Sequence, residues 1–194
     1  MSPRSSVAGA AKTRSKIVTT ALRIAANEGF QATTLGRLAG ELRMSKSGVI
    51  GPFGTMDELQ LETVREAIEA FTLAVWKPAA RETPGLPRLL RICETWLDYI
   101  SGTSYVGGCF TSAEHHPSQA VRAAVADALR GWRQALASDV EVARLAGDLR
   151  PEGDAMDVAF ELNAIALGAA QARRLDLDPV ADQRAMRAMR RVLT

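Results

Sequence analysis

The sequence is short of cysteine and of long apolar runs. Its 194 residues include only Cys93 and Cys109, too few for a disulfide framework and without CxxC spacing, so the sequence predicts reduced thiols in a reducing compartment. No stretch of about 18 apolar residues occurs, and no apolar run of signal-peptide length follows the basic residues 1–16. We therefore expect a soluble, cytoplasmic protein that has no membrane partner.

Metal ligands and catalytic motifs are also scarce. The two histidines, His115 and His116, are adjacent, and adjacent side chains on a helix project in different directions. With Glu114, Cys93 and Cys109 they contain the atom types of a metal site, but we favour a position at a loop edge without metal. The sequence has no Ser-His-Asp set, HExxH motif, phosphate loop or dinucleotide fingerprint. We expect no metal, no cofactor and no enzymatic activity.

Aromatic residues make up only 5% of the sequence. Those in the middle of the chain either line an apolar ligand cavity between helices or are ordinary core packing. Cys109 is either a redox-sensing thiol or, as is commoner, a buried and inert one. The candidate ligand-binding residues are Trp96, Tyr99, Tyr105, Cys109, Phe110, His115 and Trp132.

Positive charge is concentrated in the N-terminal quarter of the chain. Residues 1–56 carry eight Lys/Arg and two Glu, whereas the remaining 138 residues have an acidic excess of four. A basic block of this kind suits a polyanion such as DNA, because neutralised phosphates release their counterions, although it also fits a solvated face. The acidic remainder argues against a strongly anionic ligand.

Helical periodicity runs through nearly the whole chain, and no convincing alternation of strand type occurs, so the fold class is predicted as all-α. The first helix should end near Gly29, and a capping box at Thr55 should begin the fourth. Pro78, then Pro84 and Pro87, should break the next segment into a loop and a new helix start. Later helices are expected at about 86–100, 117–147, 152–174 and 179–193, the last with Asp178 as its N-cap.

Two short helical patterns stand close together, at Leu35 to Leu42 and at Lys46 to Gly51. Thr33 or Thr34 can cap the first pattern, Ser45 can cap the second, and the segment between them is a tight turn. This arrangement predicts a helix-turn-helix, whose second helix enters the DNA major groove. Val49 should face inward, and the residues presented to DNA should be Lys46, Ser47, Gly48 and Ile50.

The stretch "GFQATTLGRLAGELRMSKSGVIGPFGTMDEL" resembles the DNA-binding domain of TetR/AcrR-family transcriptional regulators. The shared features are Gly29-Phe30 at the end of the first helix, two threonines, the two short helices, Phe53 after them, and a capped fourth helix. The resemblance covers about residues 12–60, and it implies an N-terminal three-helix helix-turn-helix DNA-binding domain. The DNA contacts that follow are Thr33, Thr34, Arg43, Ser45, Lys46, Ser47, Gly48, Ile50 and Thr55.

The resemblance also implies a division of the chain. Residues 1–11 would form a flexible basic arm, residues 12–56 the DNA-binding domain, and residues 57–194 a helical ligand-binding and dimerisation domain. Three positions depart from the family pattern: Arg43 stands where Gly is usual in the turn, Ile50-Gly51-Pro52-Phe53 replaces Tyr-x-His-Phe, and Met56 replaces Lys. A non-glycine residue with positive φ costs about 1 kcal/mol, and the Arg43 guanidinium can face a phosphate.

The segment 155–170 is apolar on two faces, one containing Leu162 and the other Phe160 and Leu167. Such a helix is either central to a monomer core or covered on one side by a second copy of the chain. We favour a homodimer, with interface residues Phe160, Asn163, Leu167, Met186 and Met189.

The predicted function is that of a ligand-responsive DNA-binding transcriptional regulator, a repressor that a small apolar or amphipathic effector releases from a double-stranded DNA operator. The alternative is a helical small-molecule or thiol-redox sensor without specific DNA binding.

Overall fold

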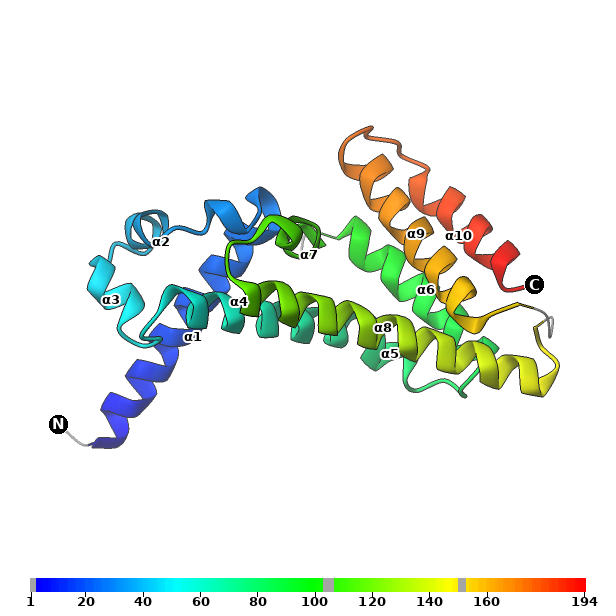
Figure 1. Ribbon diagram of the computed structural model, residues 1–194, viewed down its shortest axis with the longest axis horizontal. Helices are drawn as coiled ribbons and strands as arrows, with labels where there is room; N and C mark the ends of the chain where they lie inside the picture. The colour runs from blue at the N-terminus through cyan, green and yellow to red at the C-terminus, as the bar shows by residue number, and fades with distance from the viewer. Residues whose placement is uncertain (1–2, 103–106, 150–152) are drawn as a thin grey trace. The chain divides into compact units, whose positions relative to one another are not determined.

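The computed structural model describes residues 3–102, 107–149 and 153–194, and within these ranges the chain forms helices and connecting turns without any strand (Figure 1). The predicted all-α class is confirmed. Two compact units are present: Met1–Ala70 with Val106–Asp127, here called unit 1, and Phe71–Tyr105 with Ala128–Thr194, here called unit 2. In the described ranges no helix is both long enough and apolar enough to cross a membrane.

Unit 1 is built around a buried cluster shared by its first four helices. Its elements are α1 (Pro3–Glu28), η1 (Phe30–Ala32), α2 (Leu35–Leu42), α3 (Lys46–Ile50), α4 (Met56–Phe71, whose last residue belongs to unit 2), α7 (Gly107–Ser112), η3 (Ala113–His115) and the start of α8 (Gln119–Ala146). The buried cluster comprises Ile17, Val18, Ala21, Ile24, Leu38, Leu42, Val49, Phe53 and Leu59.

Helix α1 begins earlier than expected. Residues 3–11, predicted as a flexible arm, form its first turns. The helix ends as predicted at Gly29, which has φ 83°. Glycine also suits this position because a Cβ atom there would lie 3.2 Å from the Cβ of Ser112. The functional boundaries at residues 11 and 56 stay predictions.

Unit 2 contains η2 (Thr72–Trp76), α5 (Lys77–Ala79), α6 (Leu86–Ser101), the rest of α8, α9 (Ala155–Arg174) and α10 (Ala181–Val192). Helices α9 and α10 lie side by side and both pack on α6 (Figure 1). The apolar stripe predicted on α6 forms the centre of this core, and its buried members include Leu89, Ile92, Cys93, Trp96, Leu97 and Ile100.

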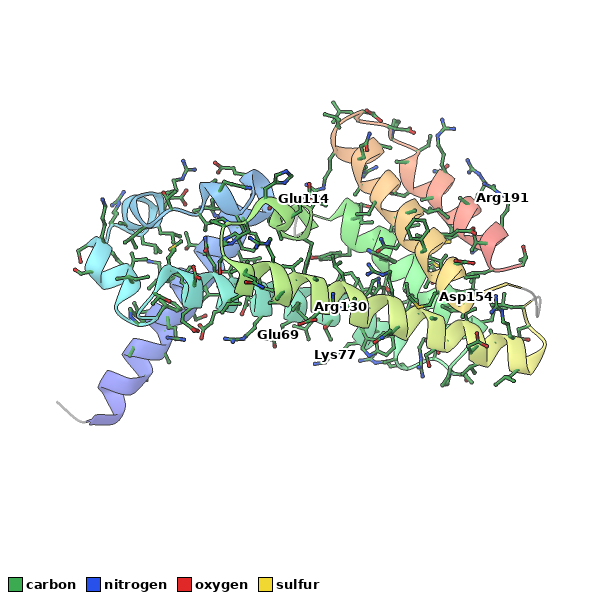
Figure 2. All side chains as sticks on the ribbon, viewed as in Figure 1. Glu69, Lys77, Glu114, Arg130, Asp154 and Arg191 are labelled. Atoms are coloured by element: carbon green, nitrogen blue, oxygen red, sulfur yellow. The ribbon has the colours of Figure 1, made fainter. Side chains whose placement is uncertain are left out.

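The predicted break after the fourth helix is confirmed, since α5 ends at Ala79 and α6 begins at Leu86 with Pro87 in its first turn. Pro78 itself lies in the first turn of α5, where its missing N–H costs no hydrogen bond, after the π-helical turn η2. The predicted start of the last helix was wrong. Asp178 is not the N-cap of the last helix, since α10 begins at Ala181 with Val180 before it. The Asp178 carboxylate instead accepts a hydrogen bond from the Val180 N–H, at 3.0 Å, and this bond lowers the pKa of Asp178. By contrast Asp154, labelled in Figure 2, caps α9 through the Met156 N–H at 2.9 Å.

Candidate functional site

Helices α2 and α3 form the predicted helix-turn-helix, and each begins with a side-chain cap. The Thr34 hydroxyl accepts a hydrogen bond from the Arg37 N–H at 3.2 Å, and the Ser45 hydroxyl accepts one from the Gly48 N–H at 3.0 Å. Thr34 is therefore the cap that the sequence left open between two threonines. Thr33 is only 2% exposed, and its hydroxyl donates to the Phe30 carbonyl, so its assignment as a DNA contact is wrong.

Arg43 adopts the left-handed conformation that the sequence comparison with the family pattern predicted, with φ 53° and ψ 45°. Its N–H donates to the Gly40 carbonyl, and the next N–H, of Met44, donates to the Ala39 carbonyl at 3.0 Å, which closes the turn. The Arg43 side chain is exposed. The backbone strain of the left-handed conformation thus occurs at a residue whose guanidinium group faces solvent.

The short helix α3 has one buried side and one exposed side. Val49 is fully buried, as predicted, and anchors the helix in the core of unit 1. Lys46 and Ser47 are exposed, whereas Gly48 and Ile50 are half-buried. The four residues predicted to contact DNA therefore lie on the outward side of α3, and Val49 holds the inner side of this helix in the core.

Thr55 and Ser45 are exposed caps whose hydroxyl oxygens accept backbone hydrogen bonds. Thr55 caps α4 by accepting from the Glu58 N–H at 3.1 Å, which is the first half of the predicted capping box. Accepting a bond leaves a hydroxyl proton that can be donated, and phosphate oxygens accept such protons. Both residues can therefore act as a cap and as a phosphate contact.

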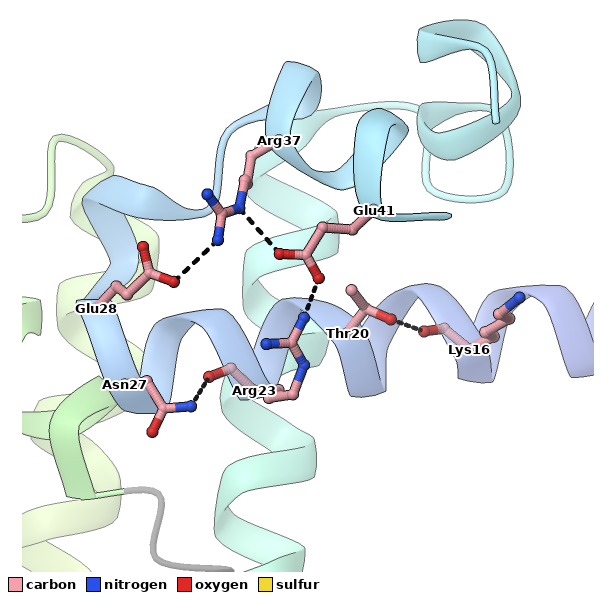
Figure 3. A network of polar contacts seen from close by, with 7 residues as sticks. All are labelled: Lys16, Thr20, Arg23, Asn27, Glu28, Arg37 and Glu41. Atoms are coloured by element: carbon pink, nitrogen blue, oxygen red, sulfur yellow. Dashed lines mark hydrogen bonds and ion pairs between the residues drawn. The ribbon is translucent and has the colours of Figure 1, made fainter. Parts of the chain in front are cut away.

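Ion pairs hold α2 against α1 (Figure 3). Glu41 of α2 pairs with Arg23 of α1 and, at 2.9 Å, with Arg37; Arg37 also pairs with Glu28 of α1 at 3.2 Å. Exposed pairs contribute little singly, but here two carboxylates and two guanidinium groups share partners across one helix interface. The network fixes the first helix of the motif and uses two of the basic side chains.

Fewer of the positive charges in residues 1–56 are available to a polyanion than a count of Lys and Arg suggests. Arg14 pairs with Glu62, in addition to the pairs of Arg23 and Arg37. Among the side chains that the structure describes, four exposed cations of this block have no ion-pair partner: Lys12, Lys16, Arg43 and Lys46. Lys12 and Lys16 were not among the predicted DNA contacts; their exposed places on α1 depend on packing that the sequence does not reveal.

Three of the predicted ligand-binding residues come together in unit 2. Trp96 and Tyr99 of α6 and Trp132 of α8 lie around Phe71, with ring centroids 6.0, 5.7 and 4.8 Å from it, all edge to face. Trp76 joins them, 6.4 Å from Trp132. We call these five residues the aromatic cluster.

The π-helical turn η2 explains why Phe71 and Trp76 share this cluster. In a regular α-helix residues five positions apart point about 140° away from each other, because each residue turns the chain by about 100°. The Lys77 N–H donates to the Thr72 carbonyl, an i→i+5 bond that widens the turn. Both rings therefore reach Trp132, a pairing that a search for regular helical spacing misses.

One polar atom in the aromatic cluster lacks a partner. The indole Nε1 of Trp132 is buried and has no hydrogen-bond acceptor in the described part of the chain. A buried N–H without an acceptor is costly, so the site favours a molecule that brings an acceptor atom.

The remaining ligand candidates are not among the five residues of the aromatic cluster. Phe110 and His115 belong to unit 1, Tyr105 falls outside the described residues, and of Cys109 only the backbone, in α7, is described. The side chain of His115 is 76% exposed and 3.2 Å from Glu114, so the choice of His115 as a cavity residue was wrong. Its neighbour His116 is the buried histidine.

The described residues provide neither a metal site nor a reactive thiol. No group of three His, Cys, Asp or Glu side chains within them is arranged around a common point. Cys93 is buried, and burial raises the pKa of its thiol to about 12, which keeps it protonated and unreactive. Redox sensing by Cys109 stays a prediction.

The predicted dimer residues divide into exposed and buried ones. On α9, Phe160 is 65% exposed and Leu167 47% exposed, while Leu162 on the opposite face is fully buried. The alternative of a central core helix is therefore wrong for this chain. Met189 was wrongly assigned to the interface, because it is fully buried where α10 packs within unit 2. Asn163 and Met186 are half-buried.

Two capped short helices, a tight turn and an outward face with unpaired cations define a helix-turn-helix protein of the all-α class. The family model described as Tetracyclin repressor-like, C-terminal domain, matches residues 85–189, more than half of the chain. The chain therefore belongs to the TetR family of transcriptional regulators. No curated protein sequence matches it in a direct comparison.

Several solved structures share this fold at low sequence identity. A TetR transcriptional regulator from Chloroflexus aurantiacus is 19% identical, with a TM-score of 0.82 over 93% of both chains. A transcriptional regulator from Saccharomonospora viridis in complex with choline is 21% identical, with a TM-score of 0.78 over 93% of this chain and 95% of that one. AibR in complex with isovaleryl coenzyme A and operator DNA is 17% identical, with a TM-score of 0.78 over 91% and 95%.

Proposed function

We propose that the protein is a homodimeric repressor that binds an operator through α3 and releases it when a small apolar or amphipathic effector binds unit 2. The observation that carries the proposal is the outward face of α3, where Lys46 and Ser47 are exposed over a fully buried Val49. The Ser45 cap and the buried Val49 hold this five-residue helix in one orientation, as a surface that reads DNA requires.

The contacts to DNA divide by chemistry. Arg43 and Lys46 bring charge to phosphates, and the hydroxyls of Thr34, Ser45 and Thr55 donate to phosphate oxygens, which positions the protein without reading sequence. Ser47 and Ile50 read the bases, Ser47 by a hydrogen bond and Ile50 by apolar contact with a thymine methyl group. Gly48 between them leaves room for a close approach of the backbone.

The exposed face of α9 supports a two-fold dimer. Phe160 and Leu167 lie two turns apart on this face, and an isologous contact would cover both copies at once. Two copies of α3 would then meet successive major grooves about 34–36 Å apart, as dimeric helix-turn-helix proteins do. The complex of AibR with operator DNA supports this use of the fold.

The aromatic cluster is our candidate for the effector site. Five rings offer an apolar surface, and the unpartnered Nε1 of Trp132 offers a donor, so the effector should combine an apolar body with an acceptor atom. Binding would change the populations of conformations that differ in the spacing of the two recognition helices. The relatives that hold choline and isovaleryl coenzyme A support a small-molecule effector.

The test is selection of binding sites from a random pool of duplex DNA, followed by affinity measurements at several salt concentrations. We expect a selected sequence with two-fold symmetry. If Lys12, Lys16, Arg43 and Lys46 of both protomers meet phosphates, log K should fall with log salt with a slope of about −7. A chain that selects no sequence, yet changes its tryptophan fluorescence on binding small molecules, would be the alternative sensor without specific DNA binding.

A further inference from the structure

Arg14 of α1 contacts two segments of unit 1 that are distant from it in sequence. One of its terminal nitrogens donates to the carbonyl of Pro52, 38 residues away. The other pairs with the carboxylate of Glu62 on α4, 48 residues away. The guanidinium carbon also lies 4.4 Å from the centroid of the Phe53 ring. One side chain thus joins α1, α4 and the turn that follows α3.

That turn follows the C-terminal end of the recognition helix. Helix α3 has only five residues, too few to be stable alone, so its direction depends on what holds its two ends. The Ser45 cap and the turn at Arg43 hold the N-terminal end. At the C-terminal end the Phe53 and Gly54 N–H groups both donate to the Ile50 carbonyl at 2.9 Å, and Gly54 has φ 82°.

Pro52 has no N–H, so its carbonyl is the one backbone group through which this residue can make a hydrogen bond. The Arg14 guanidinium donates a hydrogen bond to that carbonyl and lies over the adjacent ring of Phe53, which is part of the buried cluster. Cation–π contact, hydrogen bond and ion pair all need the planar, forked guanidinium group in one place.

We propose that Arg14 is a positioning residue for DNA recognition: it fixes the turn after α3, and so sets how Lys46, Ser47 and Ile50 enter the groove, without touching DNA itself. This inference rests on the proposed function. Because Glu62 neutralises the guanidinium, Arg14 adds little to the attraction for phosphates. Arg14 affects the selectivity of binding for one DNA sequence over another, rather than the electrostatic attraction that all DNA sequences share.

The competing role is a direct phosphate contact. Removal of a phosphate-contacting cation weakens binding to all sequences alike and reduces the salt slope by about one per protomer. Removal of a positioning residue leaves the slope unchanged and weakens binding mainly to the selected site. The two roles therefore differ in measurable quantities.

The experiment compares affinity for the selected duplex with affinity for an unrelated duplex, at several salt concentrations, in the full-length chain. Arg14→Ala is made in a Glu62→Gln background, so that no unpaired carboxylate remains and the net charge is that of the parent. For this Arg14→Ala variant we expect about a tenfold loss on the selected duplex, the size of the loss caused by one mismatched base pair, with little loss on the unrelated duplex and the parental salt slope. Arg14→Lys keeps the charge but cannot hold carbonyl, carboxylate and ring together, so we expect a smaller loss of the same kind. Arg65→Ala is the matched control, because Arg65 lines the same groove between α1 and α4.

Equal losses on both duplexes with a smaller salt slope, or no loss at all, would overturn the positioning role of Arg14. If Arg14→Ala is insoluble, the Arg14→Lys variant provides the test. If its ratio of affinity for the selected duplex to affinity for the unrelated duplex equals that of the parent, the inference is contradicted. A lower ratio, with the parental salt slope, supports the inference. A parent chain that selects no sequence overturns the proposed function, and the inference with it. A selective parent with an equally selective Arg14→Ala variant overturns the inference alone.

Discussion

The imidazole of His116 meets the ring of Phe30 edge to face, at 85° and with 5.4 Å between ring centroids. The Nδ1 atom of His116 accepts a hydrogen bond from the Ser118 N–H at 3.1 Å, which requires that nitrogen to be unprotonated. Burial lowers the pKa of His116, and the nearby Arg122 acts in the same direction, against the carboxylate of Asp57. The contact at the end of α1 is therefore made by a neutral histidine.

The stability of unit 1 should depend on pH through His116. Its pKa in the folded state lies below the 6.5 of a free histidine, so the unfolded chain takes up the proton first as the pH falls. Stability from this group is complete above pH 6.5 and is lost as the pH falls below that value, because the folded state takes up the proton less readily than the unfolded chain. Urea unfolding between pH 5.5 and 7.5 measures it. The dependence should disappear in His116→Phe and persist in His115→Ala; persistence in both variants would assign it to other groups.

Arg43→Gly should stabilise the protein and weaken its binding to DNA. Relief of the left-handed strain contributes about 1 kcal/mol, reduced by the greater freedom of glycine in the unfolded chain. The lost guanidinium should reduce the salt slope of DNA binding. Leu177→Gly is the control, because Leu177 is the other non-glycine residue with positive φ among the described residues, at 55°, and lies in the turn before α10. That variant should gain stability and bind DNA as the parent does. If Arg43→Gly binds DNA with the affinity of the parent, Arg43 does not contact DNA.

Glutamate in place of Phe160 or Leu167 should produce monomers or insoluble protein. Each substitution would bury an unpaired charge in the proposed contact between two copies of α9. Sedimentation velocity gives the mass directly. Leu145→Glu is the matched control, since Leu145 is an equally apolar side chain that is 88% exposed on α8. A soluble, unchanged dimer from both α9 variants would place the interface elsewhere.

Trp132→Phe should separate stability from effector binding. The substitution removes a buried N–H that has no acceptor within the described residues, so we expect unchanged or higher stability, by up to about 1 kcal/mol. It should weaken binding of those effectors that carry an acceptor atom, and leave purely apolar ligands unaffected. Fluorescence of the remaining Trp76 and Trp96 reports binding. A uniform loss for all ligands would mean that the indole acts by shape alone.

The sequence predicted those parts of the site that depend on neighbouring residues. The cap at Ser45, a cap at Thr33 or Thr34 and the end of α1 at Gly29 follow from the conformational preferences of a few adjacent positions. The left-handed Arg43 was implied by the resemblance to the TetR pattern, which usually has Gly there. The inward direction of Val49 follows from helical periodicity. Such features need no knowledge of the rest of the chain.

The features that the sequence missed join distant segments. Arg14 finds Pro52 and Glu62 only after four helices have packed, and no local pattern marks it among the other basic residues. The sequence likewise did not single out Lys12 and Lys16. Their charges are available to DNA, whereas Arg23 and Arg37 are engaged in ion pairs within unit 1. Thr33 and Met189 were assigned to surfaces by their neighbourhood in sequence, whereas packing buries both.

The π-helical turn at Thr72–Trp76 is equivalent to one residue inserted into an α-helix. Deletion of a single residue there would restore regular winding and swing Trp76 by about 100° around the helix axis, away from Trp132, while Phe71 kept its place. In the evolution of such regulators, gain or loss of one codon at this point would exchange one wall of the aromatic cluster and rotate the short helix α5 that follows it, without a change in the sequence of the DNA-binding helices. Effector preference could in that way diverge between descendants whose DNA-binding helices remain identical.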